Sequence, residues 1–343
     1  MTITDHPLVA RARLLAAEVL EPEAARVDQE GVPASHIEAV KRSGLLGLAA
    51  PAAYGGSAAP AAVAREVAEI LAGACGSTWF VQSQHHTPVQ VLTRGEPTAR
   101  ERLLGPLARG ELLSGVAYAQ LRAHPKAPVR ARREGAGLRF DGTVPWYTGW
   151  GLNDVLLLAG LTDDDEAVFA FVDAREQPGL RPSAPLRLAA LTAASTVSLE
   201  LDGLRVPEDA VALRIPYAHW APADRAKTLN TNPAVFGVAA AALSLLDDRT
   251  AAPLRSRLAD VRTRAYALAD HPDPLERTEE RLAVRAEAYG ELSAATTAAV
   301  VAGGGRSMSL TSRAQRLARE GMFLLIQGQT ATTRQAHLRA LAG

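Results

Sequence analysis

The chain has 343 residues, 48% of them hydrophobic, which is enough to bury a large core and to form two or three domains. Its 37 basic and 37 acidic side chains cancel, so no net field attracts it to nucleic acid or to an anionic membrane surface. We therefore expect a globular protein with a small-molecule partner, and we exclude a disordered chain, a small disulfide scaffold and a fibrous repeat.

The cysteine content and the N-terminal sequence bear on the compartment. Cys75 is the single cysteine, so the chain can form neither an internal disulfide nor a four-thiolate metal site, which favours a reducing compartment. The first residues lack a basic segment followed by an apolar one, and no stretch has the roughly 18 uncharged apolar residues that a membrane span needs. We expect a cytoplasmic protein that is neither exported nor inserted in a membrane.

The first third of the chain has helical periodicity. Apolar residues recur at helical spacing from Leu8 to about Leu20, and again from Val63 to Ala74. Residues 51–60 between them are rich in proline and glycine, which predicts a loop. This pattern predicts an N-terminal helical domain over residues 1–111.

From about residue 112 the pattern changes to short apolar runs separated by turn residues, which predicts an all-β module over residues 112–215. These runs cover residues 113–119, 137–143, 155–159, 168–172 and 196–201. A basic cluster at residues 130–133 lies between two of the runs, and we interpret its charges as solvated loop residues.

Helical spacing returns after Pro216 and predicts a helical bundle over residues 216–343. Residues 235–246 are apolar almost all round, which is typical of a core helix, whereas residues 254–268 and 282–296 repeat at three and four residues, as flanking helices do. Strands and helices do not alternate as they must to build a parallel sheet, so a Rossmann fold is disfavoured.

The motifs of several enzyme classes are missing from the sequence. The eight histidines are scattered, without His-Glu-x-x-His, Cys-x-x-Cys or Gly-x-Ser-x-Gly, so we expect neither a metal site nor a nucleophile elbow. Residues 303–308 are glycine-rich, but they follow a helical run and lack the lysine of a Walker loop. They predict a turn between helices.

Three segments, taken in order, carry a resemblance to a known family. They are residues 44–56 (Gly-Leu-Leu-Gly-Leu-Ala-Ala-Pro-Ala-Ala-Tyr-Gly-Gly), 142–149 (Gly-Thr-Val-Pro-Trp-Tyr-Thr-Gly) and 204–209 (Leu-Arg-Val-Pro-Glu-Asp). With these segments the chain resembles the acyl-CoA dehydrogenase family over nearly its whole length. The resemblance implies an α+β, mostly helical fold, with an N-terminal helical domain, a central β-barrel-like domain and a C-terminal four-helix bundle. It also implies FAD, with FMN as the alternative, between the β domain and the bundle of a homodimer or homotetramer.

A flavin ring needs a flat apolar wall and a few hydrogen bonds. Trp146 and Thr148 can supply both, since alternate residues of a strand share a side. The other cofactor contacts that the resemblance implies are Tyr147, Gln120, Arg306 and Gln329. In the alternative interpretation Trp146 and Tyr147 fill the sheet, and Arg306 and Gln329 are helix-end hydrogen-bonding residues.

The family's segments that contact the flavin edge, the acyl chain and the cofactor phosphates are altered here. Residues 119–126 replace the usual Thr-Glu-Pro-x-x-Gly-Ser-Asp strand end, and an Arg-x-x-Phe-Gly segment is deleted between Asp247 and Leu254. We therefore expect binding of full FAD to be weakened, or to use other residues.

The base that would remove the substrate's α proton is altered as well. In the resemblance the usual glutamate corresponds to Gln327, and an amide is not a general base at neutral pH. Members with the base on an earlier helix match Lys227 here, which acts as a base only if burial lowers its pKa; a surface lysine is the alternative. Asp224 and Glu320 are nearby carboxylates, which we interpret as solvated or capping residues.

Polar residues interrupt an otherwise apolar helix at residues 79–88. His85 and His86 are successive and cannot both face the core of one α-helix, so one of them is predicted to face a cavity. In flavin monooxygenases similar to this family a histidine often accepts a substrate proton, and a histidine that titrates near neutral pH suits that role. A satisfied structural histidine is the alternative.

The resemblance favours an FAD-dependent oxidoreductase of acyl-CoA dehydrogenase type. Its substrate would be the CH–CH group of an acyl thioester carried by CoA or by a carrier protein. Two alternatives stay open: a flavin-dependent monooxygenase or oxidase of the same fold in secondary metabolism, and a redox-silent scaffold that has lost its cofactor.

Overall fold

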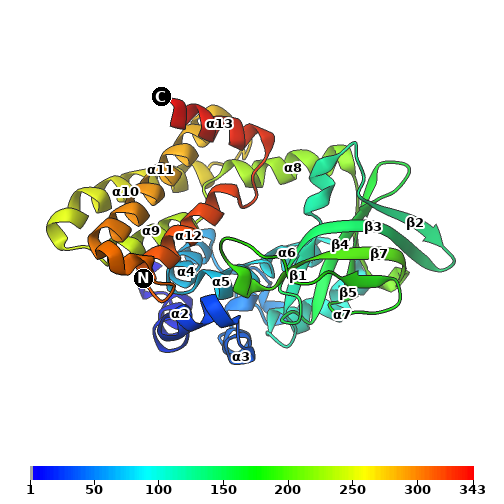
Figure 1. Cartoon of the computed structure of the whole chain (residues 1–343). Helices are drawn as coiled ribbons and strands as arrows, with labels where there is room; N and C mark the ends of the chain where they lie inside the picture. Colours follow the sequence, from blue (N-terminus) through cyan, green and yellow to red (C-terminus); the bar gives the residue numbers. More distant parts are fainter. Residues whose placement is uncertain (1–2) are drawn as a thin grey trace.

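The computed structural model describes residues 3–343, in which helices come first, a sheet follows and further helices end the chain (Figure 1). This order confirms the predicted α+β, mostly helical architecture. The domain limits at residues 111/112 and 215/216 stay a prediction. No helix within residues 3–343 combines the length and the hydropathy that a bilayer crossing requires.

The N-terminal helices follow the predicted apolar spacing. They are α1 (Pro7–Leu15), a π-helical turn (Ala16–Leu20), α2 (Glu21–Glu30), α3 (Ala34–Arg42), α4 (Ala61–Ala74), α5 (Gly76–Ser83), α6 (His86–Arg94) and α7 (Pro97–Ala108). Residues 51–60 connect α3 to α4 as a loop that contains one 3-10 turn (Ala52–Tyr54). The polar stretch at residues 79–88 is therefore two short helices with a break between them.

The central module is one eight-stranded sheet with the order β6-β7-β3-β2-β4-β5-β8, in which β1 also pairs with β4. The strands are β1 (Ser114–Ala117), β2 (Val129–Glu134), β3 (Gly137–Thr148), β4 (Val155–Leu161), β5 (Glu166–Asp173), β6 (Leu180–Pro182), β7 (Thr196–Pro207) and β8 (Val211–Pro216). Only the pairings of β4 with β1 and β2 are parallel, and the chain makes both of these crossovers through other strands of the module, without an α-helix.

The interpretation of residues 130–133 as a loop is wrong, because they lie within β2. Val129 and Ala131 are buried, whereas Arg132 and Arg133 are exposed, and β2 runs antiparallel to β3 with Arg130 opposite Asp141. One face of this strand is in the core and the other carries the arginines into water, which is ordinary for an antiparallel strand.

The C-terminal helices surround a central apolar one. They are α8 (Tyr217–Leu229), α9 (Ala234–Leu243), α10 (Asp248–Ala269), α11 (Thr278–Gly303), α12 (Arg313–Ile326) and α13 (Ala331–Ala342). Helix α9 is buried at nine of its ten positions and contacts α4, α10, α11 and α12. Residues 303–308 form the predicted turn, as a 3-10 segment (Gly304–Met308) between α11 and α12.

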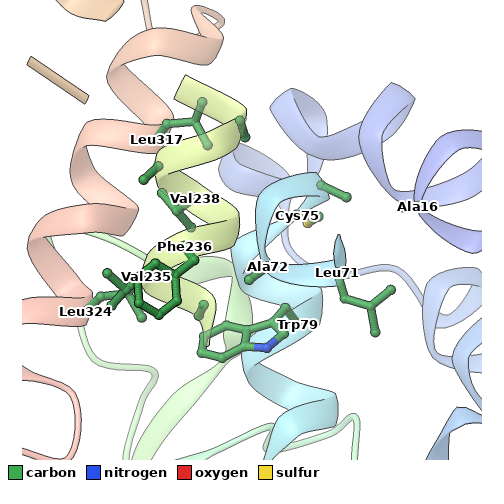
Figure 2. Packing of buried hydrophobic residues seen from close by; sticks show 14 of the residues in the cluster. Ala16, Leu71, Ala72, Cys75, Trp79, Val235, Phe236, Val238, Leu317 and Leu324 are labelled. Carbon is green, nitrogen blue, oxygen red and sulfur yellow. The ribbon is translucent and has the colours of Figure 1, made fainter. Parts of the chain in front are cut away.

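Two observations explain how α9 joins the two helical regions. A Cβ atom on Gly237 would lie 2.0 Å from the Glu69 carbonyl oxygen, so α9 approaches α4 more closely than any larger residue permits. Figure 2 shows Trp79 of α5 beside Phe236 of α9, with Leu324 of α12 nearby, in one apolar cluster. The core therefore runs without interruption from the N-terminal helices into the C-terminal ones.

Candidate functional site

A cavity of about 260 Å³ lies where α4, α5, α6, β1 and the C-terminal helices meet. Its walls are formed by Ala68, Trp79, Ser83, Gln84, Thr87, Val116, Tyr118, Asn232 and Gln327. None of these residues carries a formal charge, and seven of the nine have hydroxyl or amide groups or an indole N–H. The cavity therefore suits a ligand with an uncharged polar group beside an apolar part.

Gln327 enters the cavity from the C-terminal end of α12. Its Oε1 accepts a hydrogen bond from Asn232 Nδ2 at 2.9 Å. The Asn232 Oδ1 accepts from the Ala234 backbone N–H at 3.0 Å, which fixes the orientation of the Asn232 amide. Since the Gln327 oxygen is used in this pair, its NH₂ group is the part that can donate to a ligand.

Aromatic side chains form the apolar part of the wall. Tyr118 packs edge-on against Phe169 and Trp220, and burial raises the pKa of its phenol, which stays neutral. The Trp79 indole Nε1 is buried and has no partner among the residues described. A buried N–H without an acceptor is costly, so this group is a natural donor to a bound molecule.

The end of β3 carries an exposed aromatic side chain beside two buried ones. Trp146 is 55% exposed, whereas Tyr147 is fully buried and Thr148 is buried with its hydroxyl 3.0 Å from that of Thr196. A register shift against β7 between Val144 and Tyr147 explains why inward and outward positions do not alternate regularly here.

Strand β1 connects this strand end with the cavity. A Cβ atom on Gly115 would lie 2.7 Å from the Tyr147 hydroxyl oxygen, so β1 packs directly against the end of β3. The next residue, Val116, lines the cavity. Just beyond β1, Gln120 donates from Nε2 to the carbonyls of Ala117 and Ala159 at 2.9 and 2.8 Å, and its buried Oε1 has no partner within residues 3–343.

The chain is similar to known proteins both in part of its sequence and in its fold. Residues 4–111 match the sequence profile of the acyl-CoA dehydrogenase N-terminal domain. The short-chain specific acyl-CoA dehydrogenase of Clostridium acetobutylicum is 23% identical over 204 residues, which cover 57% of this chain and 54% of that protein. Butyryl-CoA dehydrogenase of Megasphaera elsdenii has the same fold, with a TM-score of 0.84 at 16% identity over 100% of this chain and 99% of that one. The N-terminal part of the chain therefore matches the acyl-CoA dehydrogenase N-terminal domain, and the whole chain has the acyl-CoA dehydrogenase fold.

A relative with a different activity is equally similar. Dibenzothiophene monooxygenase of Rhodococcus erythropolis is 27% identical over 214 residues, which cover 60% of this chain and 51% of that protein. The chain thus spans about half the length of the curated relatives it matches. Solved structures with this fold include complexes with FAD or with its reduced form.

Among the residues that the sequence singled out, only Gln327 lines the cavity. Tyr147 is unavailable to a cofactor, because it is buried in the sheet and its hydroxyl accepts from Asn153 Nδ2 at 2.9 Å. Trp146 does not fill the sheet, since its side chain faces water. Gln329 donates to the Leu325 carbonyl at 3.4 Å near the end of α12, and Arg306 is exposed.

The three further candidates for proton transfer lie outside the cavity lining. Lys227 is exposed on α8, although partial desolvation lowers its pKa. Asp224 and Glu320 are not solvated as expected: each is buried and paired with an arginine, Asp224 with Arg122 and Glu320 with Arg316. No carboxylate of the acyl-CoA dehydrogenase type is present among the cavity residues.

The two histidines lie at the break between α5 and α6. His85 is fully buried and its Nδ1 accepts from the Ser114 N–H at 3.1 Å, while the ring of His86 lies nearly perpendicular to it. Burial lowers the pKa of His85 to about 3 and that of His86 to about 4. The expected histidine that titrates near neutral pH is therefore not found here, because both rings stay neutral.

Because the pKa values of these histidines are low, we expect the folded protein to lose stability as the pH falls. Because the folded pKa of His85 lies below its ordinary 6.5, the unfolded chain binds more protons, and stability falls as the pH drops below 6.5 toward 3. Between pH 7 and pH 5 we expect His85 to cost about 2 kcal/mol of the free energy of unfolding. Urea unfolding at both pH values measures it. His85→Asn keeps an acceptor for the Ser114 N–H. Between pH 7 and pH 5 the variant should lose about 2 kcal/mol less of its free energy of unfolding than the native chain does. An unchanged pH dependence would contradict the assignment.

The sequence missed most of the cavity residues. Gln84 and Thr87 lie in the polar stretch that drew attention to the histidines, so the signal was present but was assigned to the wrong side chains. Asn232 and Tyr118 had no comparable signal, because each becomes a site residue only through the packing of distant segments. Residues 3–343 contain no group of three or more His, Cys, Asp or Glu that could hold a metal ion.

Proposed function

We propose that this chain is an FAD-dependent oxidoreductase of acyl-CoA dehydrogenase type that oxidises the CH–CH group of an acyl thioester. One observation carries the proposal: the cavity has uncharged polar and aromatic walls and is closed by Gln327, which stands at the position of the family's base. Strand β1 contributes Val116 to the same cavity and packs against the end of β3 that bears Trp146. Likeness to acyl-CoA dehydrogenases in sequence and fold supports the cofactor and the class of reaction, whereas the reaction itself depends on the residues of the site.

The residues present fit a flavin ring. Trp146 offers an exposed apolar face, and the buried Oε1 of Gln120 offers an acceptor without a partner, which suits the ring N–H at the pyrimidine edge. We infer that these two residues, with Thr148, hold the ring, and that Arg306 and Gln329 serve the remainder of the cofactor. When bound, FAD supplies the acceptor for the hydride that leaves the β carbon.

The chain's own residues would bind and orient the thioester. The free NH₂ of Gln327 and the Trp79 N–H are donors that a thioester carbonyl can accept from, and such bonds acidify the α carbon. Tyr118 and Phe169 behind it keep the wall apolar. With no carboxylate in the lining, the α proton would pass to water, and we expect slow turnover.

Spectroscopy tests the proposal directly. Purified protein mixed with FAD should show flavin absorbance that remains on gel filtration and is released on heating. A panel of acyl thioesters added without oxygen should bleach that absorbance, with one enoyl thioester formed per flavin reduced. Protein that stays colourless with FAD and FMN would instead indicate the redox-silent scaffold.

Trp146→Ala is expected to weaken FAD binding about fivefold or more, because aromatic stacking against a ring contributes roughly 1 kcal/mol or more. Fluorescence titration of the apoprotein with FAD measures the change. Folding should be unaffected, since the side chain is exposed. Thr143→Ala, at an exposed position of the same strand, is the matched control, and equal affinity in both variants would remove Trp146 from the site.

A flavin-dependent monooxygenase is the second candidate, and a specific observation favours it. An amide pair, Gln327 with Asn232, occupies the place where a dehydrogenase needs a carboxylate, and dibenzothiophene monooxygenase is as similar to the chain as a dehydrogenase is. Product that contains oxygen and appears only with reduced flavin and air would favour this function.

We also propose that the protein is cytoplasmic and forms a homodimer or homotetramer through its C-terminal helices. Large apolar side chains are exposed there: Val301, Met308, Leu310, Ile326 and Leu341. Exposed apolar groups gathered on one region typically mark an interface.

A further inference from the structure

Two buried arginines lie one turn apart on α11. Arg281 and Arg285 are 2% and 3% exposed, and within residues 3–343 neither of them forms an ion pair with a carboxylate. Burial of a guanidinium that stays charged is costly, so the hydrogen bonds of its donors must offset that cost. The acceptors of these donors therefore show what the two side chains hold in place.

Both arginines bind Asn230, in the short connection between α8 and α9. Arg281 donates from Nη1 to the Asn230 Oδ1 at 2.6 Å, and Arg285 donates from Nη1 to the Asn230 backbone carbonyl at 2.8 Å. Arg281 also donates from Nε and Nη2 to the backbone carbonyls of Glu276 and Asp273 at 2.8 and 3.0 Å. Asn230 is thus held by its side chain and by its backbone, and the loop before α11 is held by the same guanidinium.

Asn230 lies two residues before Asn232, whose Nδ2 donates to the Gln327 Oε1 at 2.9 Å. Thr231 between them is buried, and Pro233 after them restricts the Asn232 backbone to extended conformations. A connection this short and this restricted transmits a displacement of Asn230 to the Asn232 amide. The bonds to Asn230 therefore bear on the orientation of a cavity residue.

Arg285 also contacts the segment on the other side of that amide pair. Its guanidinium lies over the Tyr289 ring, 4.8 Å from the ring centroid, and the Tyr289 and His337 rings are 4.8 Å apart. His337 lies on α13, which begins four residues after Gln327. Arg285 thus binds the connection that carries Asn232 and, through Tyr289, contacts the helix that follows Gln327.

We propose that Arg285, together with Arg281, positions the Asn232–Gln327 amide pair. The inference rests on the proposed function, because it concerns the orientation of residues in the same site. Neither arginine lines the cavity, so both act through Asn230. Without their bonds the connection is free to move, the Asn232 amide leaves the Gln327 oxygen, and the Gln327 NH₂ group is no longer directed toward a ligand.

Selective ¹⁵N labelling of asparagine tests the proposal in the protein without substrate. The chain has three asparagines, Asn153, Asn230 and Asn232, so a spectrum of their side-chain amides contains three signals. In Arg285→Met the Asn232 signal should shift and its hydrogen exchange should become about fivefold faster or more, because one hydrogen bond is lost. The Asn153 amide donates to the Tyr147 hydroxyl in the sheet and should not change, which makes it the internal reference.

Three further variants separate positioning from a general loss of stability. Arg285→Lys keeps a donor for the Asn230 carbonyl and should restore most of the native exchange rate. Tyr289→Phe keeps the ring and removes a hydroxyl that has no partner within residues 3–343, so Asn232 should stay native. Asn230→Ala removes the Oδ1 acceptor of Arg281 at a half-buried position, and it should speed exchange at Asn232 even if Arg285→Met does not fold.

Two results in these spectra would overturn the proposal. The first is exchange at Asn232 that stays native in Asn230→Ala or in folded Arg285→Met. The second is exchange that rises as much at Asn153 as at Asn232, because a general loosening of the fold would affect both amides.

Calorimetric binding of pentanoyl-CoA to the FAD-loaded protein separates failure of this inference from failure of the proposed function. Asn232→Ala and Arg285→Met should each weaken binding about fivefold, and the double variant should weaken it no further, because both changes remove the same hydrogen bond. Additive losses would contradict positioning through Asn232. If pentanoyl-CoA does not bind the native chain but the amide signals respond as described, the positioning is correct and the thioester proposal is wrong.

Discussion

Replacing Gln327 with glutamate is expected to raise the rate of acyl-thioester oxidation by roughly a hundredfold or more. A positioned general base contributes about 10²- to 10⁴-fold, and the native amide cannot act as one. Gln327 is the cavity residue at the family's base position, and glutamate has nearly the same shape. Single-turnover bleaching of bound FAD by a saturating thioester, without oxygen, measures the rate.

The surroundings suit the introduced carboxylate. Asn232 Nδ2, held in place by the Ala234 N–H, would donate to it as it now donates to the Gln327 oxygen at 2.9 Å. This hydrogen bond favours the charged form, while burial in a cavity without other charges favours the neutral form. The two effects oppose each other, so the hydrogen bond offsets part of the cost of burying the charged form, which is the form that a general base requires.

The matched control is Gln335→Glu, which adds the same charge at an exposed position of α13, outside the cavity lining. It should leave the rate unchanged. If Gln327→Glu folds, binds FAD and still oxidises no thioester, the acyl-thioester substrate is wrong, and the monooxygenase becomes the better proposal.

The fold was largely predictable because its periodicities are strong. Helix α9 is apolar all round, and the sequence predicted a core helix there because only a buried helix permits that pattern. Strand β2 was missed because four of its six residues are charged, and the alternation of Val129 and Ala131 is too short to be recognised. Its strand character comes from pairing with β3, a tertiary effect.

The site was less predictable than the fold, because five separate segments converge on the cavity. Gln327 was found through resemblance to a motif, whereas Asn232 lies in a loop whose sequence carries no pattern. A strictly alternating strand would place Trp146 and Thr148 in the same environment, as the sequence predicted. An irregularity in the β3–β7 register instead leaves Trp146 exposed and Thr148 buried. Burial of the Arg316–Glu320 pair is likewise a property of packing, since both residues lie on a helix whose charges looked solvated.

Arg316→Met is expected to lower the free energy of unfolding by about 3–5 kcal/mol, because it leaves a buried carboxylate without its counter-ion. Arg316 and Glu320 are 3% and 5% exposed, with Nη1 2.7 Å from Oε1. The Gly76 N–H donates to the same Oε1 at 3.3 Å, and a Cβ on Gly76 would lie 2.7 Å from the Glu320 Cδ. The Glu320 carboxylate therefore contacts and hydrogen-bonds the first residue of α5. Urea unfolding measures the loss.

Two further variants separate loss of the counter-ion from loss of packing. Arg313→Met, on the same helix as Arg316, removes a partly exposed pair with Glu21 of α2 and should cost less than about 1 kcal/mol. Arg316→Met combined with Glu320→Leu removes both charges and should recover most of the stability, because a buried ion pair replaced by apolar groups is often neutral. If the double variant is as unstable as Arg316→Met, packing of the arginine stem is the cause.

The pH dependence of the stability difference between Arg316→Met and the native chain tests whether the uncompensated Glu320 charge causes the loss. Burial raises the pKa of Glu320 and Arg316 opposes that rise, so without the arginine the folded pKa lies further above the unfolded value. The folded Arg316→Met variant then binds a proton that the unfolded chain has released, and its stability relative to the native chain improves as the pH falls through that folded pKa. The histidines titrate alike in both proteins and cancel from the difference. A deficit that is constant from pH 8 to pH 5 would mean that the uncompensated charge is not its cause.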